Sequence, residues 1–256
     1  FERPEAILAL HHDFLQAGAE IIHTNTFGAS PLRLEAGQVS QGVQAANRRA
    51  VELARQAAGS VERQVFVAGS IGPCGKLLKP FGPVEESELY DSFLAQAQAL
   101  AGAGVDILLI ETQFDLKEAA TAIKAARAAA PPIPLVCSCS YDRGVKTMMG
   151  VSPSKMAAEL GDLGPDVLGI NCGRGLDENL KALQELHKAT ELPIWYKPNA
   201  GLPKVDKDGV TYYEVTPQDM AALAPQWLAE GASVIGGCCG TSPQHTAAIA
   251  AAVKKL

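Results

Sequence analysis

The stretch Asp106-Ile107-Leu108-Leu109-Ile110-Glu111 places four apolar residues in succession between two acidic ones. A strand that is apolar at every position, and not only at every second one, is typical of a sheet with both faces covered. Sheets of this kind are parallel, and their strands are usually connected by helices. The stretch therefore predicts a buried parallel strand in an α/β protein.

Short apolar strands alternate with helical segments on both sides of this stretch. The expected strands cover residues 20–26, 65–70, 106–111, 134–140, 166–171, 193–197 and 233–237. The expected helices cover residues 4–17, 41–58, 85–103, 115–129 and 177–190, and three more begin at Ser152, Thr216 and Ser242. A proline follows each of these three capping residues, as is common at the first position of a helix.

Repeated strand–helix units form either a doubly wound sheet or a closed barrel. Eight helices beside seven strands favour an α/β fold of the (β/α)8 TIM barrel type, whose first strand lies upstream of Phe1 and is missing from the chain as given. No Gly-x-Gly-x-x-Gly follows an expected strand, so a dinucleotide-binding open sheet has no support. Because 256 residues suit one barrel, we expect residues 1–256 to form a single, N-terminally truncated barrel domain.

Charge and hydropathy argue against two classes of partner. The formal net charge is −6 and the basic residues are scattered, which does not suit nucleic acid. The longest apolar runs, such as residues 105–110, are too short to cross a membrane. Six cysteines in a chain with ample core favour free thiols over disulfides, hence a reducing compartment and a cytoplasmic location.

Three cysteines stand at the ends of two expected strands. Cys172 ends the sixth strand of the expected eight, and Cys238 and Cys239 end the eighth. Barrel enzymes carry their active sites at this face, where side chains from alternate strands converge. Adjacent cysteines can share one ion only if the strand breaks, which Gly237 and Gly240 allow. The three thiols therefore predict a zinc site; the alternative is three buried cysteines that pack as small apolar side chains.

The sulfur content of such a site determines its chemistry. The charges of three thiolates and one Zn²⁺ ion sum to −1, so the ion is a weak Lewis acid toward water. A fourth thiol that binds there loses its proton and becomes a nucleophile, whereas a free thiol is only a few per cent ionised at neutral pH. Hydrolysis is less favoured because hydrolytic zinc usually has His and carboxylate ligands. The His-x-Glu and Cys-x-x-Cys pattern of zinc deaminases is absent from the sequence.

Three motifs resemble the signatures of the homocysteine S-methyltransferase family. They are Thr24-Asn25-Thr26-Phe27, Gly169-Ile170-Asn171-Cys172 and Gly236-Gly237-Cys238-Cys239-Gly240-Thr241. Residues 198–203, Pro-Asn-Ala-Gly-Leu-Pro, are most similar to the cobalamin-dependent methionine synthase branch; betaine–homocysteine methyltransferases are further relatives. The similarity begins at Arg3 and reaches the last helix. The chain departs from the family in lacking the N-terminal strand with its Asp-Gly…Gly-Thr motif.

The resemblance implies zinc on Cys172, Cys238 and Cys239, with the homocysteine sulfur as fourth ligand. It also agrees with Glu111 as the partner of the substrate ammonium; the alternative is a structural ion pair. From its position alone, Asn199 is a candidate fourth zinc ligand that the substrate would displace. The alternative is that Asn199 is only a turn residue. Asn25 and Asn171 are the remaining candidates. Each is expected either to bind the substrate carboxylate or to hold loops together by hydrogen bonds. His23 is expected to be structural.

The predicted activity is zinc-dependent methyl transfer to the thiol of homocysteine, which gives methionine. The favoured donor is a methyl-corrinoid (cobalamin) on a separate module, with S-methylmethionine, S-adenosylmethionine or betaine as alternatives. The loops 71–85 and 201–215 could form the rim where the donor, or a corrinoid or folate module, docks. Two other classes stay open: a zinc-binding or thiol-redox module without turnover, and an unrelated barrel with buried cysteines.

Overall fold

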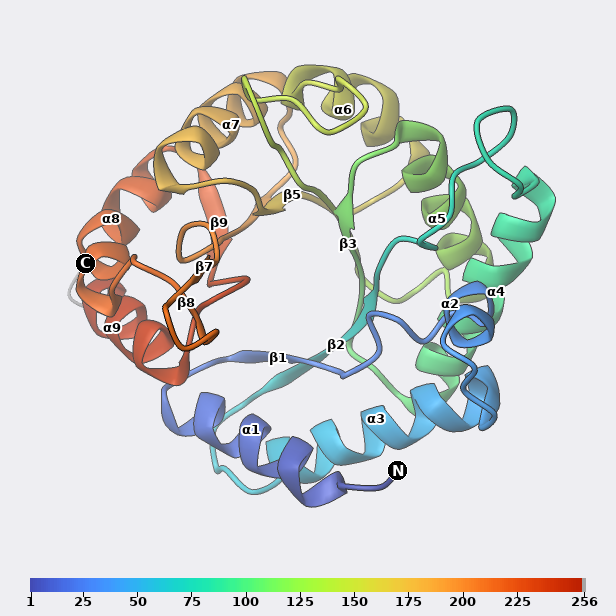
Figure 1. The fold of residues 1–256 in the computed structure, drawn as a ribbon, viewed down its shortest axis with the longest axis horizontal. Coiled ribbons are helices and arrows are strands. Elements are labelled where there is room, and N and C mark those ends of the chain that lie inside the picture. The colour runs from blue at the N-terminus through green and yellow to red at the C-terminus, as the bar shows by residue number, and fades with distance from the viewer. Residues whose placement is uncertain (255–256) are drawn as a thin grey trace.

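Seven parallel strands form one curled sheet inside a ring of helices (Figure 1), in the computed structural model, which describes residues 1–254. Each strand pairs with the next along the chain, so the sheet order is the sequence order. The strands are β1 (Ile21–His23), β2 (Phe66–Ile71), β3 (Ile107–Gln113), β4 (Leu135–Cys139), β5 (Val167–Cys172), β6 (Ile194–Pro198) and β9 (Ala232–Ile235). All seven expected strands are confirmed, and this curled parallel sheet agrees with the expected TIM-barrel type of fold.

The helices cover the outer face of the sheet. They are α1 (Pro4–Gln16), α2 (Pro31–Ala36), α3 (Gly42–Ala58), α4 (Glu86–Ala103), α5 (Leu116–Ala129), α6 (Pro153–Leu160), α7 (Leu176–Ala189), α8 (Pro217–Ala229) and α9 (Pro243–Val253), with a 3-10 turn at Gly161–Leu163. The eight expected helices are present, and α2 was not predicted. The Thr216 hydroxyl accepts a hydrogen bond from Asp219 N, and the Asp219 carboxylate accepts one from Thr216 N. This capping box stabilises the first turn of α8.

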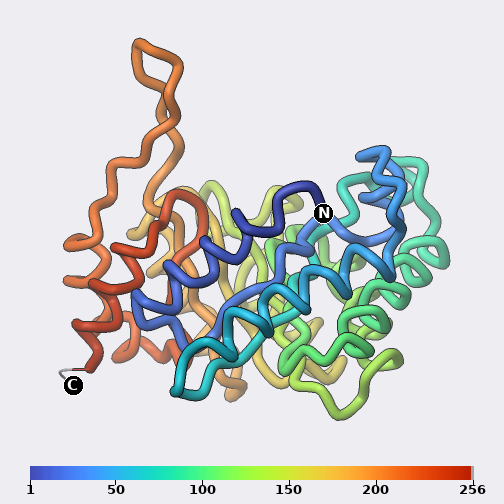
Figure 2. The backbone as a smooth tube through the Cα atoms, turned by 90° about the horizontal axis from the view of Figure 1, so that it is seen from below, coloured from blue at the N-terminus to red at the C-terminus, as the bar shows by residue number. Residues whose placement is uncertain are grey.

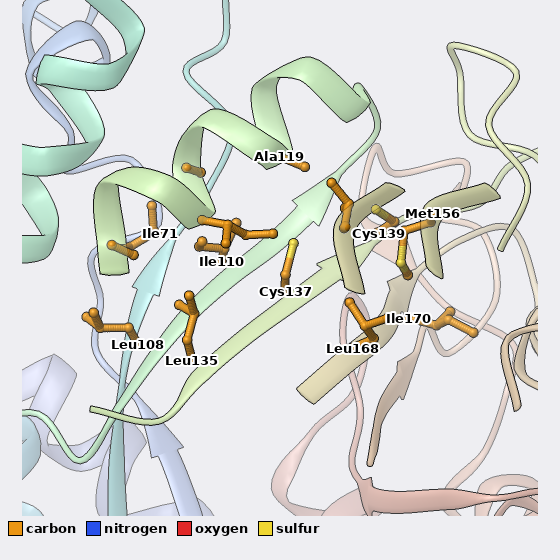
Figure 3. Close-up of a cluster of buried hydrophobic side chains, with 14 of the residues drawn as sticks. Ile71, Leu108, Ile110, Ala119, Leu135, Cys137, Cys139, Met156, Leu168 and Ile170 are labelled. Atoms are coloured by element: carbon orange, nitrogen blue, oxygen red, sulfur yellow. The ribbon is translucent and has the colours of Figure 1, made fainter. Parts of the chain in front are cut away.

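Apolar side chains fill both sides of the sheet. The large outer core lies between the sheet and the helices, and Figure 3 shows the part of it between β3, β4 and α5. Cys137 and Cys139 belong to this outer core. A second, small cluster fills the inside of the curled sheet: Ala68, Leu109, Val136 and Trp195, with Ile21, Ile107, Val167 and Val234 packed against it. Fully apolar strands such as β3 are therefore buried on both faces, as predicted.

The two end strands of the sheet, β1 and β9, do not pair with each other in the described part of the chain. A cavity of about 590 Å³ lies along them, lined by residues of α1, β1, β9 and α9 and reaching Lys197 and Cys238. The eighth strand of a closed barrel stays a prediction.

A short antiparallel hairpin follows β6 and projects beyond the rest of the chain (Figure 2). Its strands are β7 (Lys204–Val205) and β8 (Thr211–Tyr212). The Asp206 carboxylate accepts from the backbone N–H groups of Asp208 and Val210, both at 2.9 Å, and fixes the turn. The hairpin lies within the segment 201–215, one of the two loops expected at the rim.

None of the helices within residues 1–254 combines the length and the apolar character required to cross a membrane.

Candidate functional site

Six polar side chains form a layer inside the curled sheet, which we call the polar floor. Its members come one from each of β1 to β6: His23, Ser70, Glu111, Ser138, Asn171 and Lys197. Each lies two or four residues beyond a member of the inner apolar cluster on the same strand, so all face the interior. Chain direction places this floor on the carboxyl-terminal side of the apolar cluster.

Cys172, Cys238 and Cys239 come together at this carboxyl-terminal end and form what we call the sulfur cluster. The Sγ atom of Cys172 lies 3.2 Å from that of Cys238 and 3.6 Å from that of Cys239. All three sulfurs lie within 4.8 Å of one another. The prediction that two strand ends distant in sequence would bring three thiols together is confirmed.

The adjacent cysteines can face one ligand because β9 ends at Ile235, before either of them. Beyond the strand the chain turns, and Thr241 N donates to Cys238 O at 3.2 Å. Gly240 has φ +79°, and a Cβ there would lie 2.3 Å from the Tyr213 ring, so this turn requires glycine. The break in the strand that the glycines indicated is therefore present.

The sulfur cluster fits a zinc ion. Zinc–sulfur bonds of about 2.3 Å in a tetrahedral site place the sulfurs roughly 3.8 Å apart. The observed separations of 3.2 and 3.6 Å require only a small outward movement. Thiolates are soft ligands that suit zinc, and the three cysteines carry no disulfide. The exposure of Cys239 leaves the cluster accessible from the solvent side.

Asn171 connects the polar floor to the sulfur cluster. Its amide oxygen accepts from Thr112 N at 2.8 Å and from Ser138 Oγ at 2.5 Å. Its amide nitrogen donates to Thr112 Oγ1 at 2.8 Å and to Cys238 Sγ at 3.7 Å. The side chain is completely buried, so it supports Cys238 from below. That Asn171 binds the carboxylate of the substrate stays a prediction.

The backbone is strained at Cys172, which follows Asn171 in sequence, and at Thr112, which is hydrogen-bonded to the Asn171 side chain. Cys172 has φ +61° and Thr112 has φ +62°, a region that residues with a side chain rarely adopt. The Cys172 carbonyl accepts from Asn179 Nδ2 at 2.6 Å and from Asn199 N at 3.3 Å, which holds it in this conformation. Strain of this kind concentrates at functional sites, where the surrounding contacts fix the geometry.

The two remaining asparagine candidates differ in position. Asn199 is buried; its amide oxygen accepts from Cys239 N at 2.9 Å, and its amide nitrogen donates to Gly173 O at 2.8 Å. It therefore holds the loops that carry the cysteines, next to the sulfur cluster. Asn25 is exposed beyond the end of β1. Neither observation tests their predicted substrate contacts.

The surroundings of the sulfur cluster favour a thiolate at Cys238. Hydrogen bonding from the thiol of Cys172 to the Cys238 sulfur lowers the pKa of Cys238, and Lys197 and Asn171 lower it further. The same contact raises the pKa of Cys172. Cys238 is therefore the cysteine of the cluster whose thiolate form the surroundings favour most.

A compact group of charges occupies the other half of the polar floor. Ser70 Oγ donates to Glu111 Oε1 at 2.6 Å, and Lys197 Nζ lies 3.4 Å from Glu111 Oε2. His23 Nδ1 lies 3.6 Å from Glu111 Oε1. Burial raises the pKa of Glu111, but Lys197, His23 and Ser70 together outweigh burial and hold that pKa well below its ordinary value. Glu111 is therefore a carboxylate, and Lys197 is its closest cation.

Sequence reasoning missed two members of this charged group. His23 was expected to be structural, yet it belongs to the polar floor; Lys197 lies at an expected strand end but was given no role. The available signal was their position, because each lies at the end of an expected strand, like the cysteines and Glu111.

The pKa of His23 is lowered, first by burial and then by Lys197, so folding favours the neutral ring. Below about pH 6.5 the unfolded chain binds a proton here that the folded chain does not, and stability falls as the pH falls. We expect the urea unfolding free energy of the zinc-free protein to be lower at pH 5.5 than at pH 7.5. The difference should shrink in His23→Gln and persist in His187→Gln, which changes an exposed histidine. An equal difference in all three proteins would contradict this.

The family described as homocysteine S-methyltransferase matches residues 1–253. Proteins named methionine synthase from Mycobacterium tuberculosis and Mycobacterium leprae are each 30% identical, over 262 and 261 residues. These alignments cover 99% of this chain but only 22% of each relative, so the chain spans about a fifth of the length of those proteins.

Solved structures agree with the sequence relatives. The metallated form of the homocysteine methyltransferase MmuM from Escherichia coli has a TM-score of 0.81 and 29% identity, covering 98% of this chain and 85% of that chain. A type I 3-dehydroquinate dehydratase from Clostridium difficile has a TM-score of 0.60 at 11% identity and shares the fold alone. From the family match over nearly the whole chain, this protein belongs to the homocysteine S-methyltransferase family.

Proposed function

We propose that the chain catalyses zinc-dependent methyl transfer to the thiol of homocysteine, which produces methionine. The single observation that supports this best is the sulfur cluster: three cysteine sulfurs within 4.8 Å of one another at the carboxyl-terminal end of the sheet. Family membership supports homocysteine as the methyl acceptor. Residues 1–256 would act as one homocysteine-binding domain.

Cys172, Cys238 and Cys239 would hold the zinc ion. When bound, zinc lowers the pKa of a thiol ligand, so that homocysteine is available as a thiolate at neutral pH. The homocysteine sulfur then forms a bond to the methyl carbon as the bond between that carbon and the donor breaks, and the electron pair leaves with the donor. The chain itself contributes orientation: Asn171 positions Cys238, and Asn199 positions the backbone of Cys239.

The amino-acid end of homocysteine would lie over the charged half of the polar floor. Glu111 is the candidate partner of the ammonium group, since it is a buried carboxylate whose neighbours keep it ionised. Asn25, exposed at the end of β1, is a candidate contact at the entrance. Asn199 lies beside the sulfur cluster, where its amide oxygen is a candidate fourth zinc ligand before substrate arrives.

A macromolecular methyl donor is favoured by the apolar character of the loops around this end of the sheet. Nine large hydrophobic side chains are exposed on loops that follow β1, β2, β4 and β6: Phe27, Leu77, Phe81, Met148, Met149, Leu202, Val205, Val210 and Tyr212. Contiguous exposed apolar surface is typical of protein interaction sites, and these loops all lie at the face that carries the sulfur cluster. We therefore favour a methyl-corrinoid carried by another module or protein over a small donor.

A zinc-binding or thiol-redox module without turnover is the second candidate. It is favoured by the close approach of the Cys172 and Cys238 sulfurs, because two thiols at this separation could also form a disulfide on oxidation. This alternative requires no substrate, so it predicts no response of the protein to homocysteine.

Zinc-loaded and zinc-free protein would be assayed for methionine formation from homocysteine with four donors: methylcobalamin, S-methylmethionine, S-adenosylmethionine and betaine. We expect methionine from the zinc-loaded protein with methylcobalamin, and none from the zinc-free protein. Stoichiometric zinc with no methionine from any of the four donors would support the binding module instead.

A further inference from the structure

We propose that Lys197 binds the carboxylate of the amino-acid substrate, while Glu111 binds its ammonium, so that the pair selects zwitterionic thiols. This inference rests on the proposed function, because it assigns a specificity-determining residue to the same site. It adds a residue outside the sulfur cluster to the recognition of the substrate.

Lys197 occupies a central place in the charged half of the polar floor. Its Nζ atom lies 3.4 Å from Glu111 Oε2 and 3.3 and 3.4 Å from the two ring nitrogens of His23. Its side chain is 12% exposed, against 8% for that of Glu111, and it lines the cavity along β1 and β9. Burial and then Lys197 lower the pKa of His23, so the fold favours its neutral ring and leaves Lys197 as the cation of this group.

The geometry of the pair matches a zwitterion. In an α-amino acid the ammonium nitrogen and the carboxylate oxygens lie roughly 3 Å apart, as standard bond lengths require. Lys197 and Glu111 present a positive and a negative group at 3.4 Å, a spacing close to that of the two substrate charges. A substrate laid antiparallel to the pair would place each of its charges on the opposite one. Glu111 Oε1 accepts from Ser70 Oγ and Oε2 lies 3.4 Å from Lys197 Nζ, so a substrate ammonium group would share Oε2 with Lys197.

Lys197 and one cysteine of the sulfur cluster face a common space. Lys197, His23 and Cys238 line the same cavity of about 590 Å³. Gly236, opposite the Lys197 stem, has no side chain, and a Cβ there would lie 3.4 Å from Lys197 Cγ.

The alternative is that Lys197 only neutralises a buried Glu111. If Lys197 binds the substrate carboxylate, its replacement weakens the binding of thiols that carry a carboxylate and not of thiols that lack one. If Lys197 only neutralises Glu111, the effect does not depend on the ligand carboxylate. Homocysteine has two simple analogues that each lack one charge: 4-mercaptobutanoate has no ammonium group, and 3-aminopropane-1-thiol has no carboxylate.

The dissociation constants of all three thiols would be measured by calorimetry on zinc-loaded protein, with no methyl donor present. For Lys197→Gln we expect a rise of about tenfold or more for homocysteine and 4-mercaptobutanoate, and a change of less than about twofold for 3-aminopropane-1-thiol. Lys197→Arg should restore part of the affinity for the two carboxylates. Lys204→Gln, which removes an exposed lysine on the hairpin, is the matched control and should behave as wild type.

Loss of affinity for all three thiols alike, or only for the two that carry an ammonium group, would overturn the proposal. The double variant Lys197→Gln/Glu111→Gln removes both charges together, so no buried charge is left alone if the single variant fails to fold. It should bind the three thiols with similar affinities, and retained preference for homocysteine would contradict the proposal. Failure of wild type to bind any thiol would instead count against the proposed function.

Discussion

Replacement of Cys239 by alanine is expected to remove zinc and methyl transfer activity together. Cys239 supplies one of three sulfurs of the sulfur cluster and is exposed, so its loss disturbs little packing. Structural zinc sites in proteins bind their ion by about 10–16 kcal/mol in total, so losing one of three protein ligands should weaken binding by about 300-fold to 8,000-fold. Methionine formation should fall by a comparable factor, because the thiol of homocysteine would no longer be ionised at neutral pH.

Zinc content after dialysis, measured by atomic absorption, and methionine formation would check this prediction. Cys139→Ala is a matched control, because it removes a thiol of the outer core and leaves the sulfur cluster intact. The control should keep one zinc per chain. A Cys239→Ala protein that retains stoichiometric zinc and activity would show that the third sulfur is dispensable.

Asn171→Ala is expected to have the second largest effect, on both stability and zinc affinity. The substitution leaves the half-buried Thr112 N and the buried Ser138 Oγ without their shared acceptor, which should cost about 2–4 kcal/mol of unfolding free energy. It also removes the donor beneath Cys238 Sγ. Loss of a group that orients a metal ligand typically lowers affinity about 10–100-fold.

Urea unfolding of the zinc-free protein and competition with a zinc chelator would measure the two effects separately. Asn25→Ala changes an exposed asparagine just beyond the end of β1 and should alter neither quantity. Zinc affinity of Asn171→Ala equal to that of wild type would mean that Cys238 holds its position without support from the floor.

The fold was predictable because two independent features of the sequence indicate each strand: its apolar residues and its position between two helical segments. The stretch from Ile107 to Ile110 is buried in β3 as expected, with apolar clusters on both sides of the sheet. Two local features were not predictable. The helix α2 has only six residues, too few to show a helical period, and β1 ends at His23 because Thr24 and Thr26 bond to each other and to Ser70.

The sulfur cluster was predictable because strand ends in such a sheet meet at one face, whatever their separation in sequence. The charged half of the floor was not. Lys197 contacts His23 across 174 residues and Glu111 across 86 residues, and strands β1, β3 and β6 are not neighbours in the sheet. Which side chains meet across the interior depends on the curvature of the sheet and on the register of each strand, which no local pattern specifies. The support that Asn171 gives to Cys238 depends on the same register.

X-ray absorption at the zinc edge, recorded with and without homocysteine, tests most directly whether three cysteine sulfurs bind one ion and accept the substrate sulfur. The zinc-loaded protein should show three sulfur neighbours and one lighter atom at the metal, and addition of homocysteine should raise the sulfur count to four. Fewer than three sulfurs in the free protein, or a coordination shell that does not change with homocysteine, would contradict the assignment.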